Sequence, residues 1–189
     1  MGSSIASRAT GQWIDDADGL HWWFDSGSIA LDFAHPGLTT LTDAPHLATW
    51  LELRFDRSDG AVDERDVADA RALSDAIRDA AARASRNEDL EPATVDVLNL
   101  YAATPDIPPA LAGGSRQAGR SRVRTSQALS AIARAAVELF SRGEGRIREC
   151  ASDDCDIVFF DDSRSNNRRW CSMQRCGNRA KVRTFRAAH

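Results

Sequence analysis

The hydrophobic pattern of residues 21–35 predicts two short strands. This stretch is rich in aromatic and β-branched residues, and the turn-forming sequence Asp-Ser-Gly interrupts it at residues 25–27. The first strand would begin at His21, and the second would contain residues 29–33. We therefore expect a hairpin near the start of the chain.

Four later segments repeat their apolar residues at intervals of three and four, which places those residues on one face of a helix. The first segment follows Thr42 or Asp43, either of which can cap a helix. The second runs from about residue 63 to 86, and the third begins near Pro92, which suits a first helical position. The fourth follows a cap at Thr125 or Ser126 and ends near residue 141. The apolar positions of the four helices are, in order, Leu47, Trp50 and Leu51; Val67, Ala70, Leu73, Ile77 and Ala81; Val95, Leu98 and Leu100; and Leu129, Ile132, Ala133, Ala136 and Phe140.

Turn-forming residues separate the third helix from the fourth and end the fourth. Residues 104–119 contain several prolines and glycines, which predicts a loop or a short irregular hairpin. Gly143 and Gly145 stop the fourth helix, and residues 146–149 then lead as a short strand directly into Cys150. Because no flexible linker follows the helices, we expect residues 1–145 to pack against residues 146–189.

These elements predict an α+β fold that is mainly helical and has one main core. A chain of 189 residues is too short for two full domains, and a content of 42% hydrophobic and 28% charged residues is typical of soluble globular proteins. No apolar run approaches the roughly 18 residues of a membrane span, and the N-terminus lacks the pattern of a secretion signal. We therefore expect a cytoplasmic protein with no membrane segment.

Charge is distributed unevenly along the chain. All 28 acidic residues lie at or before Asp162. Residues 163–189 hold seven arginines and Lys181, so that segment has a formal charge of +8 while the rest of the chain has −12. This separation favours a polyanionic partner for the basic end, or pairing between the two ends of the chain.

The four cysteines form two equally spaced pairs. Four residues separate Cys150 from Cys155 and Cys171 from Cys176, and fifteen residues separate the two pairs. In a reducing compartment this pattern indicates one tetrahedral zinc site; two local disulfides or free core cysteines are the alternatives. Four thiolates leave no open position for a water molecule, so the predicted Zn²⁺ ion is structural.

The sequence around the cysteines fits a hairpin followed by a helix, an arrangement of the treble-clef kind. Residues 157–160 predict a strand, residues 161–167 a polar turn, and residues 168–170 the returning strand. Ser172 can cap a final helix whose first turn holds Cys176. The arginines that could offset the negative charge of the thiolates are Arg168, Arg169, Arg175 and Arg179.

The chain resembles a known family at both ends. Residues 168–181, with Cys150, Cys155 and residues 160–163, resemble the CGNR zinc finger, which is named for the sequence at residues 176–179. Residues 31–35 and 47–51 are similar to the start of the ABATE domain, which precedes the finger in that family, although the family usually has Val-Asn-Thr where this chain has Ala-His-Pro at 34–36. The resemblance implies an ABATE-like regulatory domain over residues 1–145, a CGNR-type finger over residues 146–189, and a role in stress-induced transcription regulation.

Basic residues of the predicted finger are the candidates for DNA contact. The final helix would offer its cations to phosphates or to a groove, whereas pairing with the acidic part of the chain is the competing interpretation. We expect Trp170 and Phe185 in the core of the finger. The candidate DNA-binding residues are Arg168, Arg169, Arg175, Arg179, Lys181, Arg183 and Arg186.

Two other classes of function are a ligand sensor and a zinc-stabilised protein-interaction module, neither of which needs direct DNA contact. A homodimer could form through any of the amphipathic helices. An enzyme is not expected, because the sequence has no glycine-rich phosphate loop, nucleophile elbow or paired-histidine metal motif. The residues that could line a small-molecule pocket are His21, Trp22, Trp23, Phe24, Asp32, His35 and Trp50, although aromatic residues at strand spacing more often belong to a core.

Overall fold

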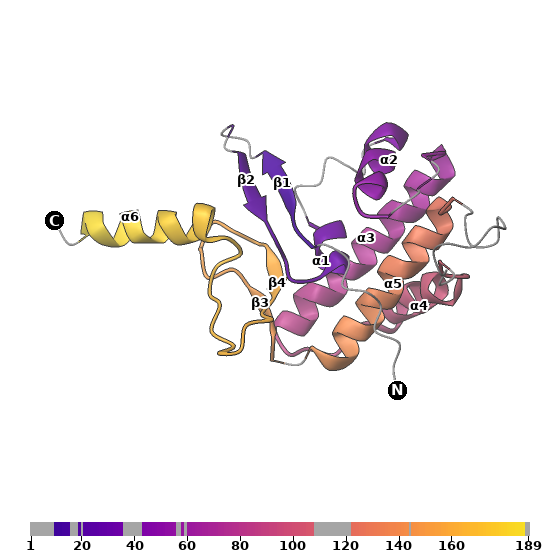
Figure 1. Ribbon diagram of the computed structural model, residues 1–189. Helices are drawn as coiled ribbons and strands as arrows, with labels where there is room; N and C mark the ends of the chain where they lie inside the picture. Colours follow the sequence, from indigo (N-terminus) through magenta and orange to yellow (C-terminus); the bar gives the residue numbers. More distant parts are fainter. Residues whose placement is uncertain are drawn as a thin grey trace.

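Helices form most of the structure. The computed structural model describes residues 10–15, 19, 21–35, 43–55, 58, 60–107, 122–143 and 145–187. Three long helices lie side by side at one end of the molecule (Figure 1): α3 (Glu64–Ser85), α4 (Pro92–Ala103) and α5 (Thr125–Arg142). The shorter helices α1 (Ile29–Phe33) and α2 (Ala44–Glu52) pack against this group.

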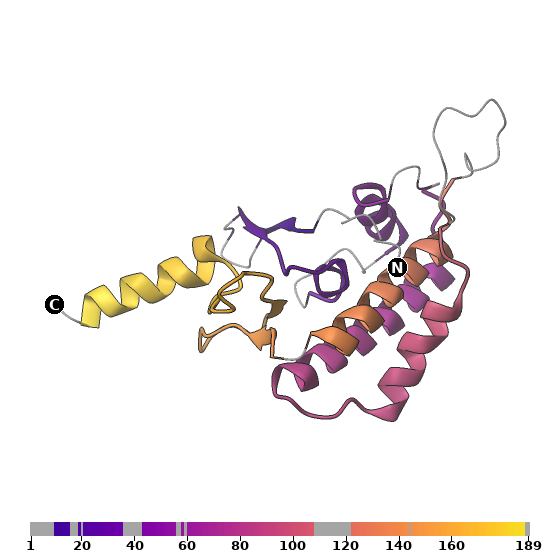
Figure 2. The same cartoon turned by 60° about the horizontal axis from the view of Figure 1, so that its bottom comes forward.

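Two small antiparallel sheets lie between the helices and the C-terminus. The first pairs β1 (Gln12–Asp15) with β2 (His21–Phe24), and the second pairs β3 (Ile147–Glu149) with β4 (Val158–Phe160). The last helix, α6 (Asn178–Ala187), projects away from the body of the molecule in both Figure 1 and Figure 2. The predicted α+β, mainly helical class is confirmed.

The predicted caps position the first long helices. Asp43 caps α2 by accepting a hydrogen bond from the His46 N–H at 3.0 Å. Asp63 and Asp66 form a capping box in which each carboxylate accepts the other's N–H, so α3 begins where the sequence indicated. Helix α4 begins at Pro92, as predicted. The predicted apolar positions of α2 and α3 are all buried.

The start of α5 differs from its prediction. Neither Thr125 nor Ser126 is the cap: the N-cap residue is Arg124, and Thr125 is the first helical residue. Thr125 is buried, and its hydroxyl donates to the Ala61 carbonyl at 3.3 Å instead of to its own helix. A tertiary contact therefore moved the boundary. The predicted loop at 104–119 lies mostly outside the described residues, which resume at residue 122.

The predicted second strand, residues 29–33, is wrong: this segment is helix α1. The Ser28 side chain accepts a hydrogen bond from the Ala30 N–H and caps the helix, and all five helical residues are buried. A short buried apolar run has no periodicity that distinguishes strand from helix, so the cap decides. The actual partner of β2 is β1, a strand that the hydrophobic pattern did not predict.

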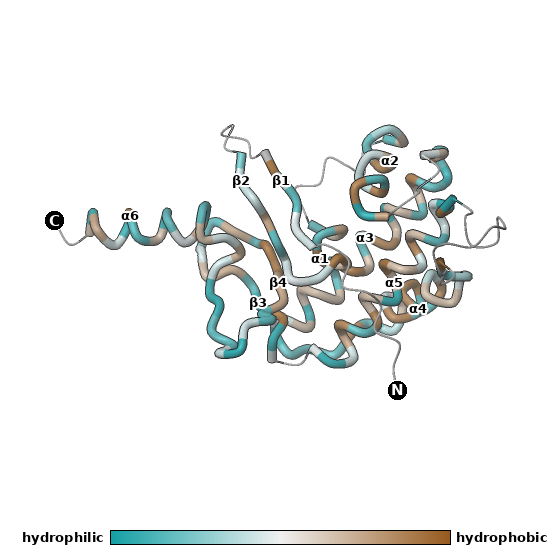
Figure 3. Tube along the Cα trace, in the orientation of Figure 1, coloured by the Kyte–Doolittle hydropathy of each residue, from teal (hydrophilic) through white to brown (hydrophobic). Residues whose placement is uncertain are grey.

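The predicted returning strand at residues 168–170 is also wrong, because β4 pairs with β3 instead. The mainly hydrophilic loop after β4 (Figure 3) is organised by the buried Asp161, whose carboxylate accepts the N–H groups of Ser163 and Arg168 at 3.0 and 2.8 Å. Burial alone would raise the pKa of Asp161, but these hydrogen bonds hold it below its ordinary value. Arg169 then offers its carbonyl to the Ala151 N–H at 2.8 Å, so this segment lies beside the first cysteine pair and not beside β4.

The β1–β2 hairpin packs on the cysteine-containing segment and not inside the main helical core. Its inward-facing Trp22 and Phe24 belong to a second apolar cluster that contains Ile157, Phe159 and three of the cysteines. The Phe160 N–H donates to the Ser26 carbonyl at 2.7 Å, which ties the end of β4 to the chain just after β2. The small C-terminal core is therefore completed by residues from the start of the chain.

Candidate metal centre

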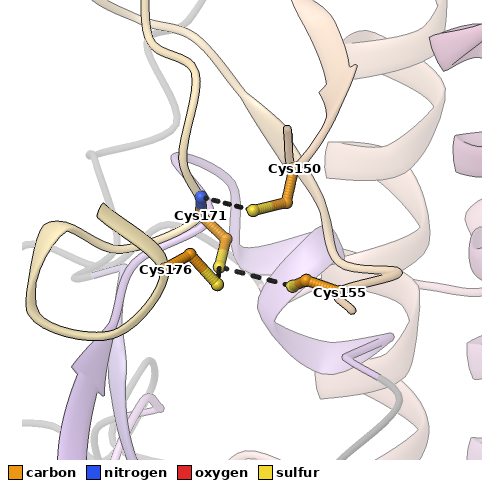
Figure 4. Close-up of side chains that lie close together, drawn as sticks. All are labelled: Cys150, Cys155, Cys171 and Cys176. Carbon is orange, nitrogen blue, oxygen red and sulfur yellow. Dashed lines mark hydrogen bonds between the residues drawn. The ribbon is translucent and has the colours of Figure 1, made fainter. Parts of the chain in front are cut away.

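Two tight backbone turns present the first cysteine pair. Cys150 directly follows β3, and its N–H donates to the Ile157 carbonyl at 2.9 Å. The Cys155 N–H donates to the Ser152 carbonyl at 3.0 Å, which bends the intervening residues back on themselves. Both side chains therefore project to the same side of the turn, as Figure 4 shows.

A capped helical turn presents the second pair. The Ser172 hydroxyl accepts a hydrogen bond from the Gln174 N–H and caps a single π-helical turn, Met173–Gly177. Ser172 is therefore a helix cap, as predicted. Cys171 lies just before the turn and Cys176 near its end, where Gly177 donates its N–H to the Ser172 carbonyl at 3.0 Å. Gly177 is tightly enclosed: a Cβ at this position would lie 2.7 Å from the Met173 sulfur.

The four sulfur atoms converge on one point. All lie within 4.8 Å of one another (Figure 4), with 3.7 Å between the Sγ atoms of Cys155 and Cys171 and 3.5 Å between those of Cys171 and Cys176. A tetrahedral zinc ion with Zn–S bonds of about 2.3 Å requires sulfur atoms about 3.8 Å apart. No disulfide joins the cysteines. The donor set and spacing fit Zn²⁺, which confirms the predicted single structural zinc ion.

The cysteine thiols influence one another's ionisation. Contacts with Cys155 and Cys171 lower the pKa of Cys150, whereas the contact with Cys150 raises the pKa of Cys155. The same crowding raises the pKa of Cys171. One thiolate therefore disfavours a second thiolate beside it, and a divalent cation bound between the sulfur atoms would offset this repulsion.

Hydrogen-bond donors surround the sulfur atoms. The Cys171 N–H donates to Cys150 Sγ at 3.4 Å, and the Arg179 guanidinium donates to Cys176 Sγ at 3.4 Å. Arg179 also pairs with Asp154 at 3.1 Å. Such outer contacts orient metal ligands and disperse their negative charge. Asp154 was not among the predicted site residues, and its position between the first two cysteines is the only sequence signal for it.

Several of the candidate DNA-binding arginines are engaged within the finger. Arg168 donates to the carbonyls of Asp25, Trp170 and Cys171, and its guanidinium lies over the Phe159 ring. Arg168 is therefore a structural residue. Arg183, one turn after Arg179, pairs with Asp154 at 2.9 Å.

The remaining candidates lie nearer the surface. The Arg169 and Arg175 guanidinium groups each lie 5.2 Å from an indole ring, those of Trp170 and Trp22 respectively. Lys181 and Arg186 are exposed on α6. Trp170 packs against the finger core as predicted, but Phe185 does not: α6 has no buried residue, and Phe185 is 65% exposed.

The predicted small-molecule pocket does not exist as one site. Trp22 and Phe24 are buried in the finger core, whereas His21 faces outward and stacks on Trp13 at 4.5 Å. Trp50 donates its indole N–H to Gln12, and the Asp32 carboxylate accepts the N–H groups of Gly11 and Ser26. The period-two pattern of β2 therefore places His21 and Trp22 on opposite faces of the hairpin, while Asp32 and Trp50 lie on helices α1 and α2.

Of the predicted pocket residues, His35 lines a cavity of about 410 Å³ between α1, α3 and the finger. The cavity has an apolar floor that includes Leu31 and Val158, and Cys155 reaches its wall. Burial lowers the pKa of His35 to about 4, so this imidazole is neutral at pH 7. The charged side chains that line the cavity are Arg78, Arg86, Glu149 and Asp156.

Two family models match the chain in the predicted order. The ABATE model, described as "Putative stress-induced transcription regulator", matches residues 10–143, and the CGNR zinc finger model matches residues 146–189. Both resemblances noted in the sequence are confirmed. No curated protein matches the chain. The helices in the described part of the chain are all too short or too polar to cross a membrane.

Proposed function

Since the chain belongs to the ABATE family of putative stress-induced transcription regulators and ends in a CGNR zinc finger, we propose that it regulates transcription by binding DNA through that finger. The observation that carries the proposal is the basic helix α6, which projects from the body and buries none of its residues (Figure 1). A helix of ten residues gains little stability alone in water, so a partner surface is expected to cover it.

The charge of the finger supports a phosphate partner. No acidic residue follows Asp162. In the part of the chain that the structure describes, the ion pairs of α6 go to Asp154 within the same finger and not to the acidic helices. Asp154 belongs to the segment with a formal charge of −12, so these two pairs are contacts of the kind that the competing interpretation expects, and they engage Arg179 and Arg183. Lys181 and Arg186 remain directed to solvent on α6.

Duplex DNA binding tests the proposal. We expect the zinc-loaded protein to bind a random 30-base-pair duplex, with the logarithm of affinity falling against log salt at a slope of about −3.6 for four neutralised phosphates. The double variant Lys181→Ala/Arg186→Ala should reduce that slope by about 1.8, because two phosphate contacts are lost. Fluorescence anisotropy at several salt concentrations measures both values.

The matched control is Arg65→Ala/Arg142→Ala, which removes two exposed arginines from α3 and α5. This control should retain the wild-type slope. Absence of duplex binding at low salt, or an unchanged slope in the Lys181/Arg186 variant, would show that α6 is not the DNA-binding surface.

The 410 Å³ cavity favours a second candidate function, the sensing of a small molecule. Pockets of this size that join an apolar floor to a few charged groups, at the junction of two packed parts, are typical ligand sites. Arg78 and Arg86 on its wall suit the carboxylate of a ligand with a small apolar body.

A thermal-shift series with short-chain carboxylic acids and amino acids tests this role. A ligand that binds only the folded protein should raise the melting temperature in proportion to the logarithm of its concentration. The shift should disappear in Ala82→Phe, which fills the cavity, and persist in the exposed-site variant Arg65→Ala. No shift with any compound of the series, or the same shift in Ala82→Phe, counts against a ligand site here.

We assign no catalytic step to the chain. A zinc ion with four thiolate ligands has no open coordination position at which to activate water, and regulation of transcription requires none. The proposed place of action is the cytoplasm, where reduced cysteines can hold the metal.

A further inference from the structure

The outer face of the β1–β2 hairpin exposes three aromatic rings, which belong to Trp13, His21 and Trp23. Trp13 is 58% and Trp23 40% exposed, although large apolar side chains rarely gather on a surface without a partner. The Trp13 and His21 rings stack at 4.5 Å, and Trp23 meets Trp13 edge-on at 5.5 Å. The rings thus form one continuous aromatic surface, which we call the aromatic face.

The finger holds this face in place. The Trp23 N–H donates to the Gln174 side chain at 3.2 Å, and the Ser172 hydroxyl donates to the Trp23 carbonyl at 3.4 Å. These contacts join β2 to the turn that carries Cys176, at the base of α6. Trp23 also lies against the backbone of Gly11, where a Cβ would come within 2.3 Å of the indole ring. The aromatic face and the basic finger are therefore parts of one surface.

A groove of about 670 Å³ begins at Trp23 and runs along the finger. Trp170 and Met173 supply apolar lining, and Arg169 supplies an exposed cation. Two carboxylates also line it, Asp25 and Asp162. The Asp25 side chain accepts the Gly27 N–H at 2.8 Å, so it is occupied in closing the turn after β2.

Aromatic rings beside arginines match the chemistry of an unpaired nucleic-acid strand. Every base has two π-faces, and stacking on an aromatic side chain contributes about 1–3 kcal/mol per base in single-strand binding proteins. In a duplex those faces are covered by neighbouring base pairs. A strand whose phosphates meet the finger's cations would therefore need unpaired bases to use the aromatic face.

We propose that the aromatic face and the adjoining groove bind unpaired DNA bases, while basic residues of the finger hold the phosphates of the same strand. This inference rests on the proposed DNA-binding function and extends it from duplex DNA to opened DNA. A protein surface could also cover exposed tryptophans, but the exposed Arg169 on the groove and the +8 charge of residues 163–189 favour a polyanion.

The test compares two strands that differ only in their bases. Fluorescein-labelled dT20 and an abasic 20-mer carry the same phosphates, so the ratio of their affinities isolates base contact from charge. We expect the zinc-loaded wild-type protein to bind dT20 at least about tenfold more tightly than the abasic strand. Trp13→Ala/Trp23→Ala should bind the two strands within about twofold of each other.

Two further variants keep the result interpretable. Leu53→Ala/Leu100→Ala removes two exposed apolar residues from the helical end and should keep the preference for dT20. Trp23→Phe retains a ring at the same position and should also keep it, which separates loss of stacking from damage to the hairpin. Zinc content and melting temperature are measured for each variant.

The outcomes distinguish this inference from the proposed function. Duplex binding without a preference for dT20 over the abasic strand overturns the inference and leaves the proposed function in place. A preference that survives in Trp13→Ala/Trp23→Ala also overturns it, because another surface, or a protein-binding role for these rings, would then be indicated. Failure to bind the duplex and both strands overturns both proposals.

Discussion

Cys171→Ser is expected to abolish stoichiometric zinc binding and to unfold the finger while most of the helical body remains folded. Cys171 is buried, and its sulfur lies within 3.7 Å of two other ligand sulfurs, so its loss opens the centre of the site. Structural zinc sites couple binding free energy, on the order of 10 kcal/mol, to local folding. The main apolar core involves α1 to α5 and contains no cysteine, so the far-ultraviolet helical signal should persist.

Metal analysis and tryptophan fluorescence measure this result. Trp22 is packed beside the cysteines, so its emission should shift to longer wavelength when the finger opens. Ser165→Ala, an exposed substitution in the same segment, should retain one zinc ion per chain and the wild-type emission. A Cys171→Ser protein that kept full zinc content would remove Cys171 from the ligand set.

Trp22→Ala is expected to weaken both the stability of the finger and its affinity for zinc, although Trp22 lies far from the cysteines in sequence. Its side chain is 1% exposed and packs against the cluster of cysteines, Ile157 and Phe159. Truncation of a buried tryptophan leaves a cavity and costs about 3–5 kcal/mol. Because the cavity adjoins the metal ligands, part of that cost should appear as weaker zinc binding.

Urea unfolding of the zinc-loaded protein and competition with a chromogenic chelator measure the two effects. Trp13→Ala is the matched control: the same residue type on the same hairpin, but on its exposed face. It should change the free energy of unfolding by less than about 1 kcal/mol. If Trp22→Ala bound zinc as tightly as the wild type, the finger would be independent of the N-terminal hairpin.

The helices were the predictable part of the fold, because their signals are local. Asp43, Asp63 and Pro92 mark starts that the structure uses, and the three- and four-residue spacing of α2 and α3 identified buried faces correctly. The start of α5 departed by one residue because a buried hydroxyl, that of Thr125, bonds to a distant carbonyl. Capping preferences and apolar spacing describe neighbouring residues, so they do not predict a hydrogen bond to a residue far away in the sequence.

The strands were harder to predict, because each depends on a partner that the sequence does not name. Residues 29–33 have the composition of a strand but form α1, since Ser28 caps them and no neighbouring strand pairs with them. Residues 168–170 come after a strand and a polar turn, as a returning strand would. Their backbone groups nevertheless bond elsewhere: the Arg168 N–H donates to the Asp161 carboxylate, and the Arg169 carbonyl accepts from the Ala151 N–H. In both cases the competition was between hydrogen-bond partners far apart in sequence.

The ligands of the candidate metal site were predictable because the spacing of the cysteines nearly suffices to identify them. Two pairs with four intervening residues each, and no other cysteine in the chain, leave one tetrahedral set. What surrounds the site was not predictable: neither Asp154 nor Trp22 was assigned to it from the sequence. Tertiary contacts, not spacing, bring those residues to the cysteines.

X-ray absorption at the zinc K edge identifies the atoms bound to the metal. We expect one zinc ion per chain with four sulfur neighbours at about 2.3 Å and no nitrogen or oxygen ligand. A first shell containing nitrogen or oxygen, or a substoichiometric metal content in protein whose thiols are fully reduced, would contradict a structural site built from Cys150, Cys155, Cys171 and Cys176.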